Sequence, residues 1–376
     1  MKFSFSDEQQ EFRSVVRRFL EDKSPTKEVR RLMETAAGVD DEVWRQLSRD
    51  LGLTAVHIPE TYGGQGFGIS ELAIAVEEMG RVLLCAPYFA STVLAATAIL
   101  KAGSEAQKLA LLPEIAAGKT IAAFAFTEDN GRWDLGGVGA TAAPSGSMFK
   151  LDGVKSFVLD GHTADLIVVL ARRPGSLGAD GLSLFTVRGD APGLERRQLE
   201  SMDPTRKLAR LQFSGVEAAL LGEAGAASGP LATTLDMAAI CLANEMVGGA
   251  EQLLRQAIEF ASQRYQFGRP IASFQTLKHR AADMLLDVEL AKSAAYYAAA
   301  AADEGDAELS ALASIAKAAA TDAYMQTAVH AVQIHGGIGF TWDNDTHLWF
   351  RRAKSSEVFL GGVAYHRERL MQMWNV

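Results

Sequence analysis

The sequence predicts an α+β protein of several domains, in which two helical regions flank a region of β-strands. Apolar residues recur at helical spacing from the N-terminus to about residue 120, and again from about residue 231. Between these limits the chain has short runs of β-branched and aromatic residues and holds five of its ten prolines. We therefore expect a helical domain over 1–120, a β domain over 121–230 and a helical domain over 231–376.

The N-terminal region has the signals of capped amphipathic helices. Ser6 followed by Gln9 is typical of a capping pair at the start of a helix. An apolar face at helical spacing follows, formed by Phe12, Val15, Val16 and Phe19. Further helices are expected over 70–81 and 91–100.

The middle region is expected to form a small β domain. Its predicted strands are short apolar runs between turn residues, and they cover 121–126, 148–151, 155–159, 166–170, 182–187 and 208–213. The pair Asp152-Gly153 separates two of these runs and is typical of a hairpin turn.

The C-terminal region returns to long helices that are interrupted by one proline, Pro270. Gly268 and Pro270 break the helical pattern, so a short corner is expected between two helices. A later helix, from Leu312 to Gln333, is rich in alanine, and small residues allow helices to approach closely. We expect this helix to form part of an interface between subunits, through Ala316, Ala318, Ala319, Ala320 and Ala323.

The composition is that of an ordinary globular protein and argues against several classes of function. The 376 residues carry a net charge of −9, so no nucleic-acid-binding surface is expected. The hydrophobic share is 48%, but charged residues run through the alanine-rich helices, so no membrane span is expected. Cys85 and Cys241 have no metal-ligand neighbours, and two cysteines fit a reducing compartment such as the cytoplasm.

The corner between the C-terminal helices carries the motif R-x-x-F-G-x-P-x-x-x-F-Q, which contains Arg264, Phe267 and Gln275. A guanidinium group beside the backbone N–H groups of helix ends suits a diphosphate. The alternative interpretation is that Arg264 is a surface charge and that Phe267 closes a hairpin.

A second motif, Q-x-x-G-G-x-G-F, ends the alanine-rich helix. Gln333 is followed by Gly336 and Gly337, and a third glycine follows at 339. Glycines stop the helix and permit a ligand to approach the backbone closely. The two motifs lie about two helices apart in the sequence.

This pair of motifs resembles the acyl-CoA dehydrogenase family, and the resemblance covers essentially the whole chain. It implies an N-terminal helical domain, a central β domain and a C-terminal four-helix bundle. It also implies FAD as cofactor, an acyl-CoA substrate, a tetramer, and electron-transfer flavoprotein as electron acceptor. The residues implied in binding the adenine-diphosphate part of FAD, largely that of a neighbouring subunit, are Arg264, Phe267, Gln275, Gln333, Gly336 and Gly337.

In this family a carboxylate removes a proton from the α-carbon of an acyl-CoA, and a hydride passes from the β-carbon to the flavin. The flavin-contacting pattern T-E-P-x-x-G-S-D resembles the segment from Thr127 to Asp134, with Trp133 at the serine position. The pattern K-x-W-I-T-N-G resembles 155–161. There Phe157 stands at the tryptophan position, and Leu159 replaces the threonine that hydrogen-bonds the flavin ring. The resemblance implies that Thr127 and Phe157 contact the flavin.

Both positions at which this family places its catalytic glutamate are apolar here. The turn that resembles Y-E-G-T is 359–362, which puts Leu360 at the glutamate position. Other members carry the glutamate on the first helix of the C-terminal bundle, where Ala238 stands. Glu245 is the nearest carboxylate on that helix, about two helical turns from Ala238. It is a candidate base, with a helix or subunit contact as the alternative interpretation.

Three interpretations follow from this mixture of retained and altered motifs. In the first, the chain is an acyl-CoA dehydrogenase subunit without its own glutamate, and it completes the active site of a paralogous subunit in a tetramer. Segments 157–165, 202–209 and 347–356 resemble the bacterial branch that degrades sterols and related ring compounds, in which some members are α2β2 heterotetramers. In the second, the chain is a homotetramer with another base or with non-oxidative chemistry such as desulfination. In the third, it is a flavin-free, non-catalytic subunit.

Overall fold

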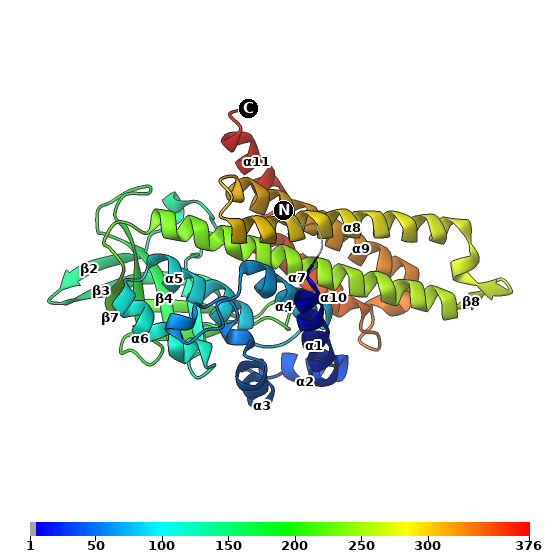
Figure 1. Ribbon diagram of the computed structural model, residues 1–376, viewed down its shortest axis with the longest axis horizontal. Helices are drawn as coiled ribbons and strands as arrows, with labels where there is room; N and C mark the ends of the chain where they lie inside the picture. Colours follow the sequence, from blue (N-terminus) through cyan, green and yellow to red (C-terminus); the bar gives the residue numbers. More distant parts are fainter. Residues whose placement is uncertain (1–4) are drawn as a thin grey trace. The chain divides into compact units, whose positions relative to one another are not determined.

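The structure is a computed structural model that describes residues 5–376, and the order of its elements can be followed in Figure 1. The chain forms two compact units. The first consists of the described part of Met1–Arg31 together with Ile69–Leu84 and Ala239–Val376, and the second of Leu32–Gly68 and Cys85–Ala238. The expected domain limits near residues 120 and 230 stay a prediction.

The first unit is built from helices. They are α1 (Asp7–Lys23), the start of α2 (Thr26–Met33), α4 (Ile69–Arg81), α7 (Ser228–Gln263) from Ala239 onward, α8 (Gln275–Glu304), α9 (Leu309–His335), α10 (Thr346–Val358) and α11 (Val363–Met373). The predicted capping pair of α1 is confirmed, because Ser6 Oγ accepts from the Gln9 backbone N–H at 3.2 Å while Gln9 Oε1 accepts from the Ser6 N–H. The predicted corner between α7 and α8 is also present, as a hairpin of β8 (Tyr265–Gln266) and β9 (Arg269–Pro270).

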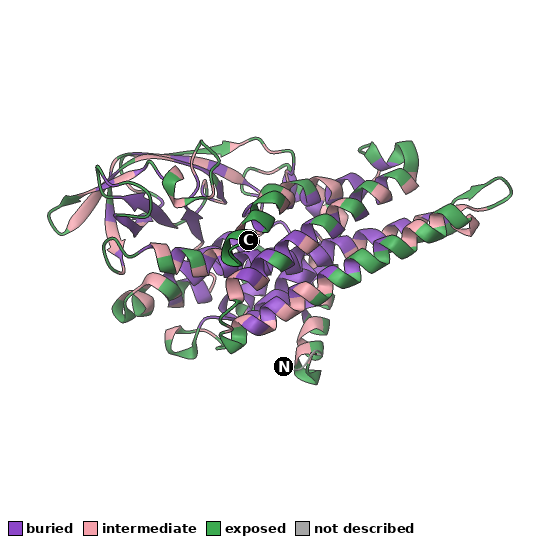
Figure 2. Cartoon of the chain, turned by 90° about the horizontal axis from the view of Figure 1, so that it is seen from above, coloured by how far each residue is buried: buried purple, intermediate pink, exposed green. Residues whose placement is uncertain are grey.

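Small residues let the helices of the first unit pack closely. Helix α9 contacts α8, α10 and α11, and Figure 2 shows buried residues along the inner faces of the long helices while the hairpin tip is exposed. The alanines of α9 serve this packing. The expectation that they face another subunit is wrong for four of them, since each is at most 8% exposed within the single chain: Ala316, Ala318, Ala320 and Ala323.

Helices α4 and α7 touch through their backbones. A Cβ atom at Gly248 of α7 would lie 2.0 Å from the carbonyl oxygen of Glu77, and one at Gly80 of α4 would lie 2.0 Å from the carbonyl oxygen of Glu245. Only glycine allows so close an approach at these two positions. The crossing places the buried side chains of Glu77 and Glu245 next to the contact.

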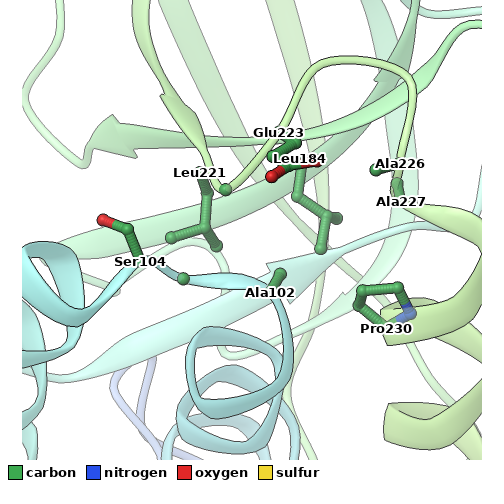
Figure 3. A pocket seen from close by; sticks show the side chains of 10 residues that line it. Ala102, Ser104, Leu184, Leu221, Glu223, Ala226, Ala227 and Pro230 are labelled. Carbon is green, nitrogen blue, oxygen red and sulfur yellow. The ribbon is translucent and has the colours of Figure 1, made fainter.

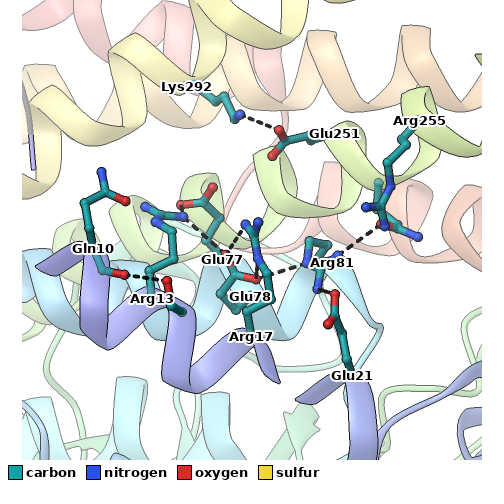
Figure 4. A network of polar contacts seen from close by, with 12 residues as sticks. Gln10, Arg13, Arg17, Glu21, Glu77, Glu78, Arg81, Glu251, Arg255 and Lys292 are labelled. Carbon is teal, nitrogen blue, oxygen red and sulfur yellow. Dashed lines mark hydrogen bonds and ion pairs between the residues drawn. The ribbon is translucent and has the colours of Figure 1, made fainter. Parts of the chain in front are cut away.

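A network of charged side chains joins α1 to α4 (Figure 4). Glu78 is 1% exposed and accepts hydrogen bonds from Arg17 at 2.7 and 2.9 Å and from Arg81 at 3.0 Å. Arg13 bonds Glu77 at 2.7 Å, and Tyr296 of α8 donates its hydroxyl proton to Glu77. Because each buried carboxylate faces a cation, the network avoids the cost of an unpaired buried charge.

The second unit combines short helices with a β-sheet. Its helices are α3 (Asp41–Arg45), a π-helical segment (Phe89–Ala96) that continues into α5 (Thr97–Ala102), and α6 (Glu105–Ala116). Its strands are β1 (Ala122–Ala125), β2 (Thr141–Ser145), β3 (Met148–Leu159), β4 (Leu166–Arg172), β5 (Leu182–Arg188), β6 (Leu194–Leu199) and β7 (Leu208–Leu221). The expectation of helices followed by a small β region is met.

The sheet closes on itself. The strands run in the order β1-β4-β2-β3-β7-β5, and β5 pairs again with β4. Strand β6 pairs with the first half of β7, residues 208–213. The apolar side chains enclosed by this ring form the core of the β region, among them Ile167, Phe185, Leu211 and Phe213. Alternate residues of a strand point to opposite faces of the sheet, so the residues of this core recur at every second position, as Ile167, Val169 and Ala171 do in β4.

The predicted hairpin turn at Asp152-Gly153 is wrong. The turn lies earlier, at Gly146 between β2 and β3, and Gly153 is inside the continuous strand β3, where the register with β7 shifts. Gly153 has φ +134°, and a Cβ atom there would lie 2.7 Å from the Cα of Ala140. Its glycine serves a close backbone approach within an irregular strand rather than a turn.

Within the described residues, no helix combines the length and the apolar character needed to cross a membrane.

Candidate functional site

The first motif lies at an exposed end of the first unit. Phe267 occupies the hairpin tip, is 91% exposed and has φ +54°. Arg264 ends helix α7, Gln275 begins helix α8, and both side chains are exposed. Neither side chain has a hydrogen-bond or ion-pair partner among the described residues. An exposed aromatic tip and a free guanidinium group are what a ligand or second chain would cover.

The second motif lies beside the helices of the first. The ring of His335, at the end of α9, stacks on Phe260 of α7 with centroids 4.2 Å apart. Arg280 of α8 donates to Gln333 Oε1 at 3.4 Å. The structure therefore brings the end of α9 next to α7 and α8, close to where those two helices meet the hairpin (Figure 1).

The glycines of the second motif leave an open stretch of backbone. Gly336 has φ +68°, and a Cβ atom at either Gly336 or Gly337 would meet no other atom within 4 Å. Both residues are exposed, as is Gln333. The Gly336 N–H caps α9 by donating to the carbonyl oxygens of Gln333 and Val332. The absence of side chains at both glycines allows a ligand to approach the backbone closely.

The loop that follows is braced by residues that the sequence did not single out. Arg30 of α2 donates to Asp345 at 2.7 Å and to the carbonyl oxygen of Asn344 at 3.0 Å. The guanidinium of Arg351 lies over the ring of Trp342, 5.1 Å from its centroid. These contacts hold the loop in place, and no sequence pattern pairs Arg30 with a segment more than 300 residues away.

In the second unit, Thr127 lies two residues after the end of β1, and Phe157 lies in β3. Thr127 is buried and donates its hydroxyl proton to the Ser156 carbonyl at 2.6 Å, while the Ser156 N–H donates to the Thr127 carbonyl. Phe157 sits at an irregularity of β3 with φ +60° and is 45% exposed. A phenyl ring held out of the sheet by an unusual backbone shape can form a face for a planar ligand ring.

The residues that differ from the family patterns, Trp133 and Leu159, fill part of this region. Trp133 is half-buried and packs on Phe126 with centroids 5.8 Å apart, and Leu159 is 5% exposed. A bulky indole thus occupies the position where the family pattern has serine. The altered positions retain apolar packing but supply no side-chain donor at Leu159.

Polar contacts of Glu128 and Asp129 hold the 127–140 loop against the sheet. Lys155 is fully buried, and its ammonium group bonds Glu128 at 2.8 Å and the Phe126 carbonyl at 3.3 Å. Burial lowers the pKa of Lys155 to about 8. Asp129, at the proline position of the pattern, accepts from Arg210 at 3.0 Å and from Ser156. The Arg210 guanidinium holds the pKa of the Asp129 carboxyl below its usual value.

The candidate base positions lack a free carboxylate. Leu360 is 5% exposed and Ala238 is completely buried. The carboxylate of Glu245 is 6% exposed and accepts from Arg352 Nη1 at 3.0 Å, within a buried ion pair between α7 and α10. This pair could not be predicted from the sequence, because nothing in the RRAK segment distinguishes the inward-facing Arg352 from its neighbour Arg351.

A cavity of about 350 Å³ lies in the second unit, between the α5–α6 corner and the connection from β7 to α7 (Figure 3). Leu184, Leu221 and Pro230 contribute apolar walls, and Ser104 and Glu223 lie at its rim. None of the residues predicted for cofactor or substrate binding lines this cavity. No group of metal-ligating side chains is present among the described residues.

Known proteins match this chain over nearly its whole length. Three family models match the chain: Acyl-CoA dehydrogenase, N-terminal domain, over residues 6–119; the middle domain over 123–216; and the C-terminal domain over 230–373. The acyl-CoA dehydrogenase IpdE2 of Mycobacterium tuberculosis is 33% identical over 354 residues, which cover 94% of this chain and 93% of that protein.

Solved structures agree with these matches. Butyryl-CoA dehydrogenase from Megasphaera elsdenii superposes with a TM-score of 0.93 at 30% identity and covers both chains completely. A variant of the Tcur3481-Tcur3483 steroid ACAD gives 0.88 at 30% identity over 98% of each chain. A chain from work on the electron transferring flavoprotein of Acidaminococcus fermentans gives 0.92 at 30% identity, over 100% of this chain and 99% of that chain.

The architecture, helical domain, β domain and helical domain in that order, is the one these relatives share, and the two nucleotide-type motifs lie together at one end of the first unit. FAD is the cofactor of this family. This chain belongs to the acyl-CoA dehydrogenase family of oxidoreductases.

Proposed function

We propose that this chain is a subunit of an acyl-CoA dehydrogenase assembly that binds the adenine-diphosphate part of FAD for a neighbouring subunit and has no general base of its own. One contrast carries the proposal. Arg264 and Gln275 are exposed without partners at one end of the first unit, as far as the described residues go, whereas both positions expected to hold the base, Leu360 and Ala238, are apolar and buried.

The residues of the two motifs would each have a simple task. Arg264 donates to the diphosphate, Gly336 and Gly337 let the cofactor approach the backbone closely, and Phe267 inserts its exposed ring beside the cofactor or the adjoining subunit. Thr127 and Phe157 provide contacts for the flavin ring. FAD, when bound, accepts the hydride from the β-carbon of the substrate.

Glu245 is better suited to a structural task than to proton removal. A general base must lie against the substrate proton, whereas this carboxylate is buried and accepts from Arg352 at 3.0 Å. Both side chains of the pair are at most 7% exposed. The pair joins α7 to α10. Removing either partner would leave the other charge buried and unpaired, so each side chain is needed where these two helices pack together.

The relatives support further parts of the proposal. The name Tcur3481-Tcur3483 joins two chains in one steroid ACAD, which supports a tetramer with a paralogous subunit and a steroid-like acyl-CoA as substrate. The likeness to a chain from work on an electron transferring flavoprotein supports that protein as electron acceptor. Two cysteines without a disulfide fit a cytoplasmic location.

The test compares the isolated chain with the chain co-purified with a paralogous subunit. We expect the isolated chain to reduce flavin with butyryl-CoA more slowly by about 10²–10⁴-fold, because no positioned base removes the α-proton. Rapid bleaching of the flavin by the isolated chain would contradict the proposal. The substitution E245Q, which keeps an oxygen acceptor for Arg352, would then show whether Glu245 is the base.

Restoring a carboxylate provides a second test. L360E and A238E, each made separately in the isolated chain, should raise the rate of flavin reduction if the pocket still holds an acyl-CoA beside the flavin. Two alternative functions predict different results. A homotetramer with another base or with non-oxidative chemistry would purify without a paralogous subunit. A flavin-free, non-catalytic subunit would show no flavin spectrum.

A further inference from the structure

A lysine buried in the first unit holds the turn that contains Leu360. Lys317 lies in an alanine-rich stretch of α9 and is completely buried. Its ammonium group donates to the carbonyl oxygens of Ser356 at 2.9 Å, Glu357 at 3.0 Å and Gly361 at 2.9 Å, and to the hydroxyl of Thr321 at 3.1 Å. Burial lowers the pKa of the Lys317 ammonium group to about 7. Its three N–H bonds are shared among the four oxygen atoms, which together fix the position of the nitrogen.

These bonds complete the end of helix α10. The last four carbonyl groups of a helix have no partner within it. Here Ser355 accepts from the Phe359 N–H at 3.2 Å and Val358 accepts from the Gly361 N–H at 3.3 Å. The remaining two carbonyl groups, those of Ser356 and Glu357, are the ones that Lys317 binds. The lysine therefore ends the helix and fixes the start of the turn at once.

The turn itself is strained. Val358 to Gly361 form a turn closed by a backbone hydrogen bond, in which Phe359 has φ −69° and ψ 135° and Leu360 has φ +58°. These angles match a type II turn, whose third residue is normally glycine or asparagine. A branched leucine in the left-handed region is unfavourable and persists only where its surroundings impose it.

A second buried side chain binds the same turn. His366 of α11 lies with its Nε2 atom 3.0 Å from the carbonyl oxygen of Leu360, and its ring is 1% exposed. As a neutral imidazole it donates this proton, because a carbonyl oxygen can only accept. His366 and Lys317 thus hold the consecutive carbonyl groups of Leu360 and Gly361.

We propose that Lys317 and His366 are positioning residues that keep Leu360 in this strained turn, so that its side chain forms an apolar contact for the acyl group of the bound thioester. The proposal rests on the proposed function for the location of the substrate. Strained residues collect at ligand sites, where geometry outweighs local preference. Glycine at position 360 would relieve the backbone strain at the expense of one buried side chain.

The first experiment measures the holding of the turn in the full chain, with no need for flavin. Hydrogen exchange is compared between segment 358–362 and a buried segment of α8, 291–301, in the wild type and in K317M. We expect exchange in the turn to quicken by about tenfold or more while α8 is unchanged, since methionine keeps the apolar stem but donates no hydrogen bond. Equal acceleration in both segments, or none in the turn, would overturn the proposal.

A double substitution distinguishes backbone strain at Leu360 from a general loss of stability. It can also be used if K317M alone folds poorly. Glycine adopts φ near +60° freely, so a turn with glycine at position 360 needs little holding. We expect K317M/L360G to unfold at a higher temperature than K317M, although L360G alone removes a buried side chain from the wild type. If L360G lowers the unfolding temperature equally in both backgrounds, the lysine does not hold a strained leucine.

The last experiment tests the ligand contact in the flavin-loaded assembly, with butyryl-CoA as probe. We expect butyryl-CoA to slow exchange in segment 358–362 of the wild type. A change in the flavin spectrum without any change in this segment would overturn the contact with the acyl group. An assembly without flavin would contradict the proposed function instead, and the first two experiments would still decide whether the turn is held.

Discussion

Two buried histidines, His57 and His366, make the stability of this protein sensitive to acid. Burial, together with the positive charge of a nearby lysine, lowers the pKa of each imidazole to about 4. An unfolded chain binds a proton at each residue near pH 6.5. The stabilisation from keeping the rings neutral is therefore complete above that pH and is lost as the pH falls towards 4.

We predict that the free energy of unfolding falls steeply between about pH 6.5 and pH 4, with each histidine contributing up to about 3 kcal/mol. H366Q should flatten this fall, because glutamine does not titrate. The measurement is urea unfolding at several pH values in this range. H279Q is the matched control, since His279 is exposed, and an unchanged slope in H366Q would contradict the assignment.

Arg264 offers a sharper test of the cofactor motif than any other residue in it. Its guanidinium group has no partner among the described residues, so removing it breaks no internal contact. We predict that R264A weakens FAD retention by about 1.5–3 kcal/mol, the value of a charge-assisted hydrogen bond. Flavin content after dialysis of the assembled protein is the readout. R255A is the control, because Arg255 is an exposed arginine on the same helix.

At the level of single residues, the sequence predicts side chains that act alone better than those that act in pairs. Arg264, Phe267 and the glycines stand in recognisable order along the chain, and they lie exposed at one end of the first unit. The Glu245–Arg352 pair and the bonds of Lys317 to the turn join residues more than 35 positions apart. One signal was available for Lys317: a single lysine within an apolar, alanine-rich helical face needs buried oxygen partners.

At the level of elements, the crossing of α4 and α7 depends on glycine. A methyl group at Gly248 would lie 2.0 Å from the carbonyl oxygen of Glu77, so one backbone would have to move. We predict that G248A destabilises the protein by about 1–3 kcal/mol, the usual cost of overpacking. Thermal or urea unfolding measures the change.

The same helix provides the control for this prediction. Gly229 lies in the first turn of α7, and a Cβ atom there would meet nothing within 4 Å. G229A should be neutral or stabilising by up to about 1 kcal/mol, because alanine favours the helix. The two substitutions are chemically identical and are expected to have opposite signs. If both have the same effect, helix propensity rather than contact at the crossing controls the outcome.

Strands with a clear apolar run could be predicted, and strands defined by their partners could not. The runs at 166–170 and 182–187 match β4 and β5 closely, because both strands are almost wholly buried. Strand β6 was missed: its sequence is LERRQL, its middle residues are exposed, and only pairing with β7 makes it a strand. Strand β2 contains Pro144 and polar neighbours, which are typical of a turn when its partner β3 is unknown.

At the level of the whole molecule, the surface of α8 indicates how chains associate. Leu286 and Leu290 are 59% and 61% exposed and, four residues apart, lie on one face of the helix. Four of the alanines of α9 are covered within the chain, so they cannot form the interface that the sequence suggested. Exposed leucines on α8 and the exposed ring of Phe267 at the hairpin tip are apolar groups that a neighbour can cover.

We predict a tetramer in which α8 contributes to the interface. L286E/L290E should convert it to smaller species, because burying two carboxylates without partners is unfavourable. Light scattering at micromolar concentration measures the assembly, and L109E is the matched control, since Leu109 is 56% exposed on α6 in the other unit. A wild-type monomer would contradict the prediction and would leave the exposed diphosphate motif without the neighbouring subunit that it is proposed to serve. A tetramer that survives L286E/L290E would instead place the interface on another face, and Phe267 would be the next residue to change.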